Sequence, residues 1–136
     1  MPLMTWTEDM SVGVRVLDDD HKRLVAMLND LYDAIQNGRG KETMGRILND
    51  LVQYTKVHFA REEKFFGETG YPGLAAHKKE HDALTGQVID VQRKFTVGAN
   101  AALSIDVLRF LRDWLTNHIQ GTDRKYQPHL NAKGIR

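Results

Sequence analysis

The sequence contains no cysteine, no excess of one charge and no long hydrophobic run. Without cysteine the chain cannot form disulfides, thiolate zinc sites, iron–sulfur clusters or a covalent c-type haem attachment. Any metal must therefore be held by nitrogen and oxygen atoms. No segment approaches the length of a transmembrane helix, which predicts no membrane insertion. Residues 1–7 show no basic stretch followed by an apolar run, so we expect no signal peptide and a cytoplasmic location.

Acidic and basic residues are balanced, with 19 basic and 18 acidic side chains and a formal net charge of +1. This balance argues against nucleic acid or an anionic membrane surface as the main partner. The 136 residues fit one domain, so we expect a single domain over residues 1–136. Hydrophobic residues make up 41% of the chain, which is enough for a buried core.

Clusters of glycine, asparagine and proline predict three loops, at 37–40, 67–73 and 96–104. Between the loops, apolar residues recur with the spacing of amphipathic helices. These segments cover residues 18–37, 42–66, 74–95 and 104–120. We therefore expect an all-α fold, an antiparallel up-down-up-down four-helix bundle. An N-terminal arm of residues 1–17 precedes it, and a short C-terminal tail follows, in which a helical turn or two come before Pro128 and His129 lies at the surface.

Acidic residues stand at two of the predicted helix starts. Asp18, Asp19 and Asp20 open the first helix, where we interpret them as an N-cap and as favourable charges at the positive end of the helix dipole. Ser104 and Asp106 are expected to do the same for the fourth helix.

Five of the six histidines fall on the apolar faces that are predicted to form the core, together with one glutamate. A single histidine on such a face is more often an ordinary core residue than a ligand. Five on four helices would instead leave many polar rings buried without partners, at about 1–3 kcal/mol each. Metal coordination would satisfy them together. These residues are His21, His58, Glu62, His77, His81 and His118.

The spacing of the candidate ligands supports this interpretation. His58 and Glu62 are four residues apart and share one helix face, and His77 and His81 repeat that spacing. His118 is followed five residues later by Asp123, an offset that a regular helix would turn off the face. Because Gly121 and Thr122 intervene, we expect the fourth helix to end or distort at Gly121. Asp123, otherwise an ordinary aspartate at a helix end, could then fold back as a ligand.

Five imidazoles and two carboxylates exceed what one tetrahedral zinc ion takes, and they suit two ions bridged by the carboxylates. Imidazole-rich sites favour iron, copper, zinc or nickel over magnesium or calcium. The Glu-x-x-His motif of carboxylate-rich di-iron bundles is absent from the sequence. We therefore expect a site that binds a ligand rather than one that drives strong oxidation.

The complete set of motifs resembles the hemerythrin family, and its single-domain bacterial members in particular. The residues at 6–7 and 112–115 are also similar to that group, and the resemblance covers essentially the whole chain. It implies two iron ions bridged by Glu62, Asp123 and an oxo or hydroxo group. One iron would be held by His77, His81 and His118. The other would be held by His21 and His58, with one open position where dioxygen binds end-on and reversibly.

By similarity, Leu24, Phe59, Trp114 and Ile119 would line the oxygen pocket. They can equally be plain core residues, and both interpretations can hold. A dry apolar lining would slow the entry of protons and the loss of bound oxygen as superoxide or peroxide.

The resemblance implies reversible dioxygen binding for oxygen storage, transport or delivery, without catalysis. We expect dioxygen as the ligand, an oxygen-consuming enzyme as the recipient, and a monomer. One alternative is a redox enzyme that reduces peroxide or nitric oxide at the same site. Another is an oxygen- or nitric-oxide-responsive sensor, which ranks last because the chain shows no output domain.

Overall fold

The computed structural model describes residues 2–39, 41–96 and 105–136, and the segment at 97–104, with Ser104, lies outside the described residues. Four long helices make up most of the described chain, and a series of short helical turns follows α4. The long helices are α1 (Arg15–Gln36), α2 (Lys41–Thr69), α3 (Leu74–Thr96) and α4 (Ile105–Asn117). The short elements are η1 (Glu8–Met10), the π turn η3 (His118–Thr122), η4 (Asp123–Tyr126) and α5 (Gln127–Ala132).

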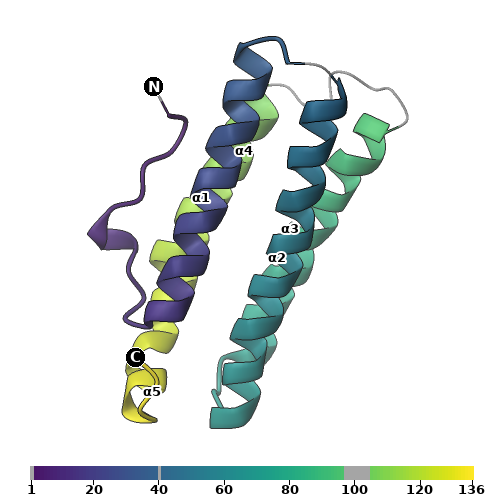
Figure 1. The fold of residues 1–136 in the computed structure, drawn as a ribbon. Helices are drawn as coiled ribbons and strands as arrows, with labels where there is room; N and C mark the ends of the chain where they lie inside the picture. Colours follow the sequence, from purple (N-terminus) through teal and green to yellow (C-terminus); the bar gives the residue numbers. More distant parts are fainter. Residues whose placement is uncertain (1, 40, 97–104) are drawn as a thin grey trace.

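The helices pack as an antiparallel bundle, with α1 against α2 and α4, and α2 against α3 (Figure 1). The N-terminal arm runs beside α1, and α5 lies at the end of the bundle where α1 begins and α2 ends. This arrangement confirms the predicted all-α four-helix bundle with its arm and tail.

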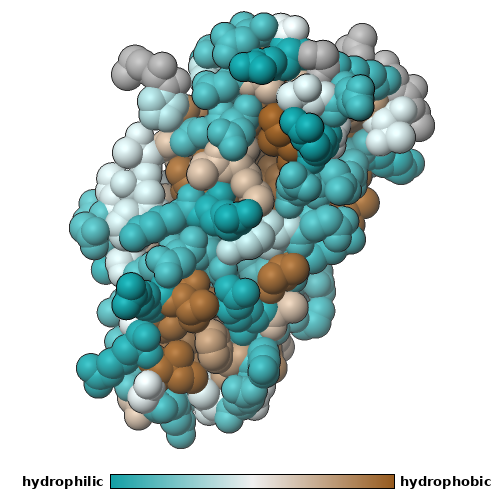
Figure 2. Space-filling model, in the orientation of Figure 1, coloured by the Kyte–Doolittle hydropathy of each residue, from teal (hydrophilic) through white to brown (hydrophobic). Residues whose placement is uncertain are grey.

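The core is formed by the apolar faces of the helices. Leu17, Leu31, Leu48 and Leu108 are fully buried, and burial of each side chain stabilises the fold by about 1.5–3 kcal/mol. The face of the molecule in Figure 2 is mostly hydrophilic, with hydrophobic residues in small separate groups. No helix in the described part of the chain combines the length and hydrophobicity needed to cross a bilayer.

The first helix begins at Arg15, three residues before the predicted start, so the N-cap interpretation of the three aspartates was wrong. Gly13 has a φ of 70° and turns the chain into α1. Asp18 instead fastens the arm, since its carboxylate accepts the backbone N–H of Val12 at 2.8 Å and the hydroxyl of Ser11 at 2.6 Å. Asp20 is buried and faces the bundle interior.

The second helix also runs further than predicted. Gly67 lies inside α2, which ends at Thr69, and the chain leaves the helix at Gly70 with a φ of 67°. A left-handed residue directly after a helix is a common helix terminator, and glycine adopts that conformation without strain.

The tail departs from the prediction in two ways. Pro128 lies in the first turn of α5, where a missing N–H breaks no helical hydrogen bond, so helix continues past it. His129 is half-buried rather than free at the surface. Its Nε2 lies 2.9 Å from the hydroxyl of Thr69, and its ring packs on Tyr71. His129 therefore attaches the tail to the end of α2.

Candidate metal centre

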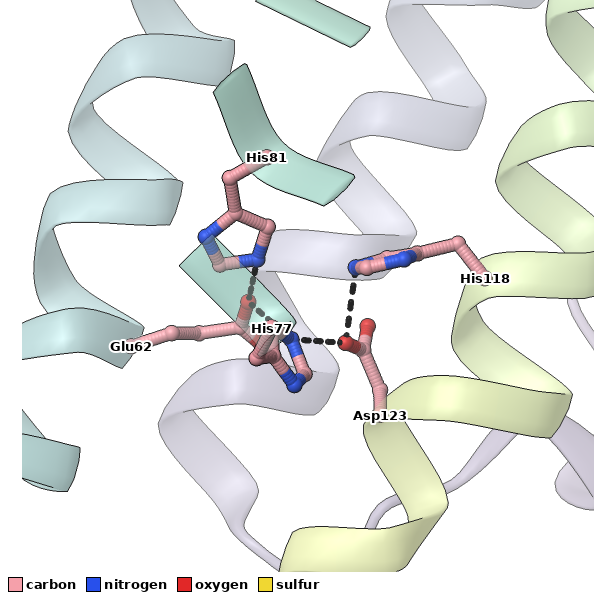
Figure 3. A group of neighbouring side chains, drawn as sticks. All are labelled: Glu62, His77, His81, His118 and Asp123. Carbon is pink, nitrogen blue, oxygen red and sulfur yellow. Dashed lines mark ion pairs between the residues drawn. The ribbon is translucent and has the colours of Figure 1, made fainter. Parts of the chain in front are cut away.

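All seven predicted ligands meet inside the bundle, in the half that is closed by α5. They come from α1, α2 and α3 and from the short turns that follow α4, and each is at most 3% exposed. Figure 3 shows five of them pointing toward one another. The full set is His21 on α1, His58 and Glu62 on α2, His77 and His81 on α3, His118 in η3 and Asp123 in η4.

The π turn brings His118 and Asp123 onto one face. The backbone N–H of Asp123 donates to the carbonyl of His118, five residues earlier, which widens the helix by one residue per turn. The distortion was predicted, but it begins at His118 and not at Gly121. Gly121 has no positive φ, and open space surrounds the position where a Cβ would stand, so glycine itself does not cause the turn.

Asp123 faces two groups of histidines with its two oxygens. Its Oδ1 lies 2.7 Å from Nε2 of His77 and 2.9 Å from Nε2 of His118. Its Oδ2 lies 3.1 Å from Nε2 of His21. This division of the oxygens is what a carboxylate that bridges two metal ions requires.

Glu62 also contacts histidines of both groups. Its Oε1 lies 3.0 Å from Nε2 of His81 and 3.5 Å from Nε2 of His58. Its Oε2 lies 3.7 Å from Nε2 of His21 and accepts a 2.7 Å hydrogen bond from the hydroxyl of Tyr126, which holds the carboxylate in place.

Two overlapping sets of donor atoms result, each with all its atoms within 4.8 Å of one another. Glu62 and Asp123 belong to both sets. The three-histidine group adds His77, His81 and His118, and the two-histidine group adds His21 and His58.

The donor atoms of this cluster lack the hydrogen bonds that buried polar atoms normally make. In the described chain, ten buried side-chain nitrogen and oxygen atoms have no hydrogen-bond partner, and nine belong to the cluster. The tenth is the indole nitrogen of Trp6. Most of these atoms lie within ion-pair distance of another member of the cluster, and any atom that stays unsatisfied costs about 1–3 kcal/mol. Because nitrogen and carboxylate oxygen lone pairs converge there, the residues fit a pair of metal ions.

In the metal-free protein the cluster is a buried set of ion pairs. Burial lowers the pKa of His77, but the Asp123 and Glu62 carboxylates outweigh it and raise this pKa from 6.5 to about 9. The pKa of His21 is raised by the same carboxylates against the effect of burial. Burial raises the pKa of Asp123, yet His118, His21 and His77 hold it well below 3.8. The pKa of Glu62 is lowered likewise, since neighbouring histidines outweigh burial and the charge of Asp123.

We expect the metal-free protein to be most stable between about pH 4 and 6.5. The folded pKa of His77 exceeds its unfolded value, so its contribution is complete below pH 6.5 and is lost as the pH rises through about 9. That difference corresponds to about 3 kcal/mol. The pKa values of Asp123 and Glu62 are depressed, so their contributions are present above about pH 4 and are lost as the pH falls further.

Urea denaturation of the metal-free protein from pH 3 to 10 measures this effect. The metal-loaded protein is the control, and it should hold or gain stability as the pH rises, because metals bind the deprotonated histidine. A metal-free denaturation midpoint that stays constant between about pH 6.5 and 9 would contradict the expected ion pairing.

Carboxylates face the outer nitrogens of three of the histidines, and sequence spacing did not reveal them. Nδ1 of His58 lies 2.9 Å from Asp20, and Nδ1 of His81 lies 2.9 Å from Glu63. Nδ1 of His118 lies 3.6 Å from Glu80, a longer ion-pair distance. Such groups orient a ligand histidine and raise its basicity. Their positions depend on how the helices pack, so no local pattern identifies them.

A cavity of about 30 Å³ lies between the helices next to the cluster, which is room for one or two molecules of the size of water. Its lining is apolar except for Thr55, whose hydroxyl donates to the carbonyl of Leu51 at 2.7 Å. The described residues that line the cavity are Leu24, Leu28, Leu51, Thr55, Phe59, Leu84, Val88, Leu111 and Leu115.

Two of the four predicted pocket residues line this cavity, and the other two lie elsewhere around the cluster. Leu24 and Phe59 form part of the lining, and the Phe59 ring stacks on His81 with centroids 3.8 Å apart. Trp114 is half-buried and stacks on His118 with centroids 4.7 Å apart, and Ile119 is fully buried. A role of these four side chains in oxygen binding stays a prediction.

Comparison with known proteins agrees with this geometry. Residues 12–130 match the model of the hemerythrin HHE cation-binding domain. Bacteriohemerythrin of Methylococcus capsulatus is 43% identical over 97% of this chain and its own full length. Bacteriohemerythrin of Stenotrophomonas maltophilia is 36% identical over 97% of this chain and 84% of its own length. A crystal structure of wild-type hemerythrin superposes with a TM-score of 0.88 at 42% identity, covering 94% of this chain and 98% of that one.

A bundle with a buried histidine and carboxylate cluster defines a cation-binding helical protein. The chain belongs to the hemerythrin family, because the family model spans nearly its whole length and the relatives exceed 30% identity.

Proposed function

We propose that this chain binds dioxygen reversibly at a pair of iron ions and serves in oxygen storage, transport or delivery. The names of its relatives support oxygen binding, and the buried cluster supports metal binding. The iron pair would supply the electrons that hold dioxygen reversibly. Delivery to an oxygen-consuming enzyme, and a monomeric state, stay predictions.

The observation that carries the proposal is the unequal division of the donor atoms. One group contains three histidines and two carboxylates, and the other contains two histidines and the same two carboxylates. If both ions are six-coordinate, the two-histidine group leaves one more position open. An open position is what a small ligand requires, whereas a site with every position filled is structural.

The apolar cavity supports binding over catalysis. It adjoins Leu24 and Phe59, which follow His21 and His58 in the sequence, and it has room for a diatomic molecule but not for a larger substrate. No charged side chain of the described residues lines it. The chain would therefore keep water and protons away from a bound ligand, and it would offer no acid or base that could complete a reaction.

Reversible oxygenation tests the proposal directly. The iron-loaded protein would be reduced without oxygen, exposed to air and then purged with argon, while the visible spectrum is recorded. We expect a charge-transfer band that appears with air and disappears on purging over several cycles. A band that decays at once to a di-ferric product, and that purging cannot reverse, would overturn the proposal in favour of an oxygen-consuming enzyme.

A further inference from the structure

We propose that Asp20 is the positioning residue that orients His58 for metal coordination, and that it thereby controls the affinity of the two-histidine group for its metal. The inference rests on the two-metal site of the proposed function. It concerns one ion of the pair, and it does not depend on what the pair binds.

Asp20 connects α1 to three positions on one face of α2. Its Oδ2 lies 2.9 Å from Nδ1 of His58, and its Oδ1 accepts hydrogen bonds from the Tyr54 hydroxyl and the Arg61 guanidinium. The three partners lie four and three residues apart and so face the same side of α2. The carboxylate is held from three directions, and its own position is therefore well defined.

The contact decides which nitrogen of His58 is available. A carboxylate that faces Nδ1 accepts a hydrogen from it, so the lone pair stands on Nε2, which points to Glu62 at 3.5 Å. The rings of His58 and His21 are packed edge to face, with centroids 4.6 Å apart. Asp20 is next to His21 in the sequence. Its contact with Nδ1 of His58 thus orients the His58 ring beside that of His21, the other histidine of the same group.

The two groups differ in how their histidines are supported. Asp20 is 2% exposed, whereas the side chains of Glu63 and Glu80, which face histidines of the three-histidine group, are 25% and 45% exposed. Water screens a buried charge less than an exposed one, so Asp20 should act more strongly on its histidine.

Metal affinity of the two-histidine group should also depend strongly on Asp20, because His58 is the histidine of that group whose outer nitrogen faces a carboxylate. His21 is the other histidine of that group, and its Nδ1 is buried without a hydrogen-bond partner. A change at Asp20 therefore affects the one outer nitrogen in the group that a carboxylate supports.

Stepwise titration of the metal-free protein with cobalt(II), followed by calorimetry and visible absorption, tests the inference. We expect wild type to bind two ions, and Asp20→Asn to bind one of them about 10–100-fold more weakly while the other is unaffected. Asp19→Asn is the matched control, since it makes the same change on the exposed neighbouring residue and should match wild type. Glu63→Gln should weaken the other ion instead.

A purely structural role for Asp20 would give a different result. Urea denaturation of the metal-free variants would then show a loss of stability for Asp20→Asn. The two cobalt-binding steps would be either unchanged or weakened equally, and each of these two results would overturn the inference. Binding of fewer than two ions by wild type would overturn it as well. If the cobalt steps behave as expected but the iron protein fails to release oxygen, the proposed function fails and the role of Asp20 stands.

Discussion

Replacing Asp123 with alanine should abolish binding of the metal pair. Asp123 is fully buried and is the residue whose two oxygens face separate histidine groups, with His77 and His118 on one oxygen and His21 on the other. Loss of a residue that orients a ligand costs about 10–100-fold in affinity, and loss of a shared ligand should cost more at both ions. Metal analysis after reconstitution with ferrous iron measures the stoichiometry per chain.

The matched control for this change is Asp113→Ala. Asp113 lies on α4 ten residues earlier and is exposed, so its removal should leave metal binding unaltered. The Asp123→Ala variant should also lose its ion pairs in the metal-free state, and circular dichroism would establish whether it remains helical. A folded Asp123→Ala variant that binds as much iron as wild type would show that Asp123 is not a ligand.

Replacing Phe59 with alanine should both destabilise the protein and shorten the lifetime of its oxygenated form. Phe59 is 4% exposed, lines the cavity and stacks on His81 with an angle of 6° between the rings. Loss of a buried phenylalanine costs about 3–5 kcal/mol. The enlarged cavity would admit water and protons next to the metal pair, so conversion of the iron protein to the di-ferric form should be faster.

Thermal unfolding and the rate of spectral decay in air measure the two effects, and Phe110→Ala provides the control. Phe110 is 52% exposed on α4, so the same change there should affect neither quantity strongly. The variant Phe59→Leu keeps most of the volume and should restore stability. An autoxidation rate in Phe59→Ala equal to that of wild type would show that this ring does not protect the pocket.

The helical fold and the inward direction of the candidate ligands on their helices could be predicted because both depend on local periodicity. Spacings such as His58 to Glu62 and His77 to His81 place two side chains on one helix face wherever that helix lies. Apolar residues on the same faces show which side is buried. The five-residue offset from His118 to Asp123 indicated a distortion. The distortion is a π turn that starts at His118. Local spacing did not reveal this, because no single residue type, such as glycine, marks the start of a π turn.

Errors at the helix ends have a related cause. The aspartates at 18–20 resemble an N-cap in sequence, yet they lie inside α1. There Asp18 accepts hydrogen bonds from the arm, and Asp20 contacts His58 of α2. His129 follows a proline in a polar tail, which predicts exposure, but the tail folds onto Thr69 and Tyr71. In each case a contact between distant segments outweighed the local signal.

The sequence by itself therefore determined the helical class, the inward faces and the residue types that meet there. The tertiary structure decided which atoms of those residues face one another: the two oxygens of Asp123 between two histidine groups, and the buried Asp20 behind His58. The physical reason is that periodicity sets the direction of a side chain around its own helix. The rotation and offset of one helix against another arise from packing of the whole core, which no single segment of the sequence contains.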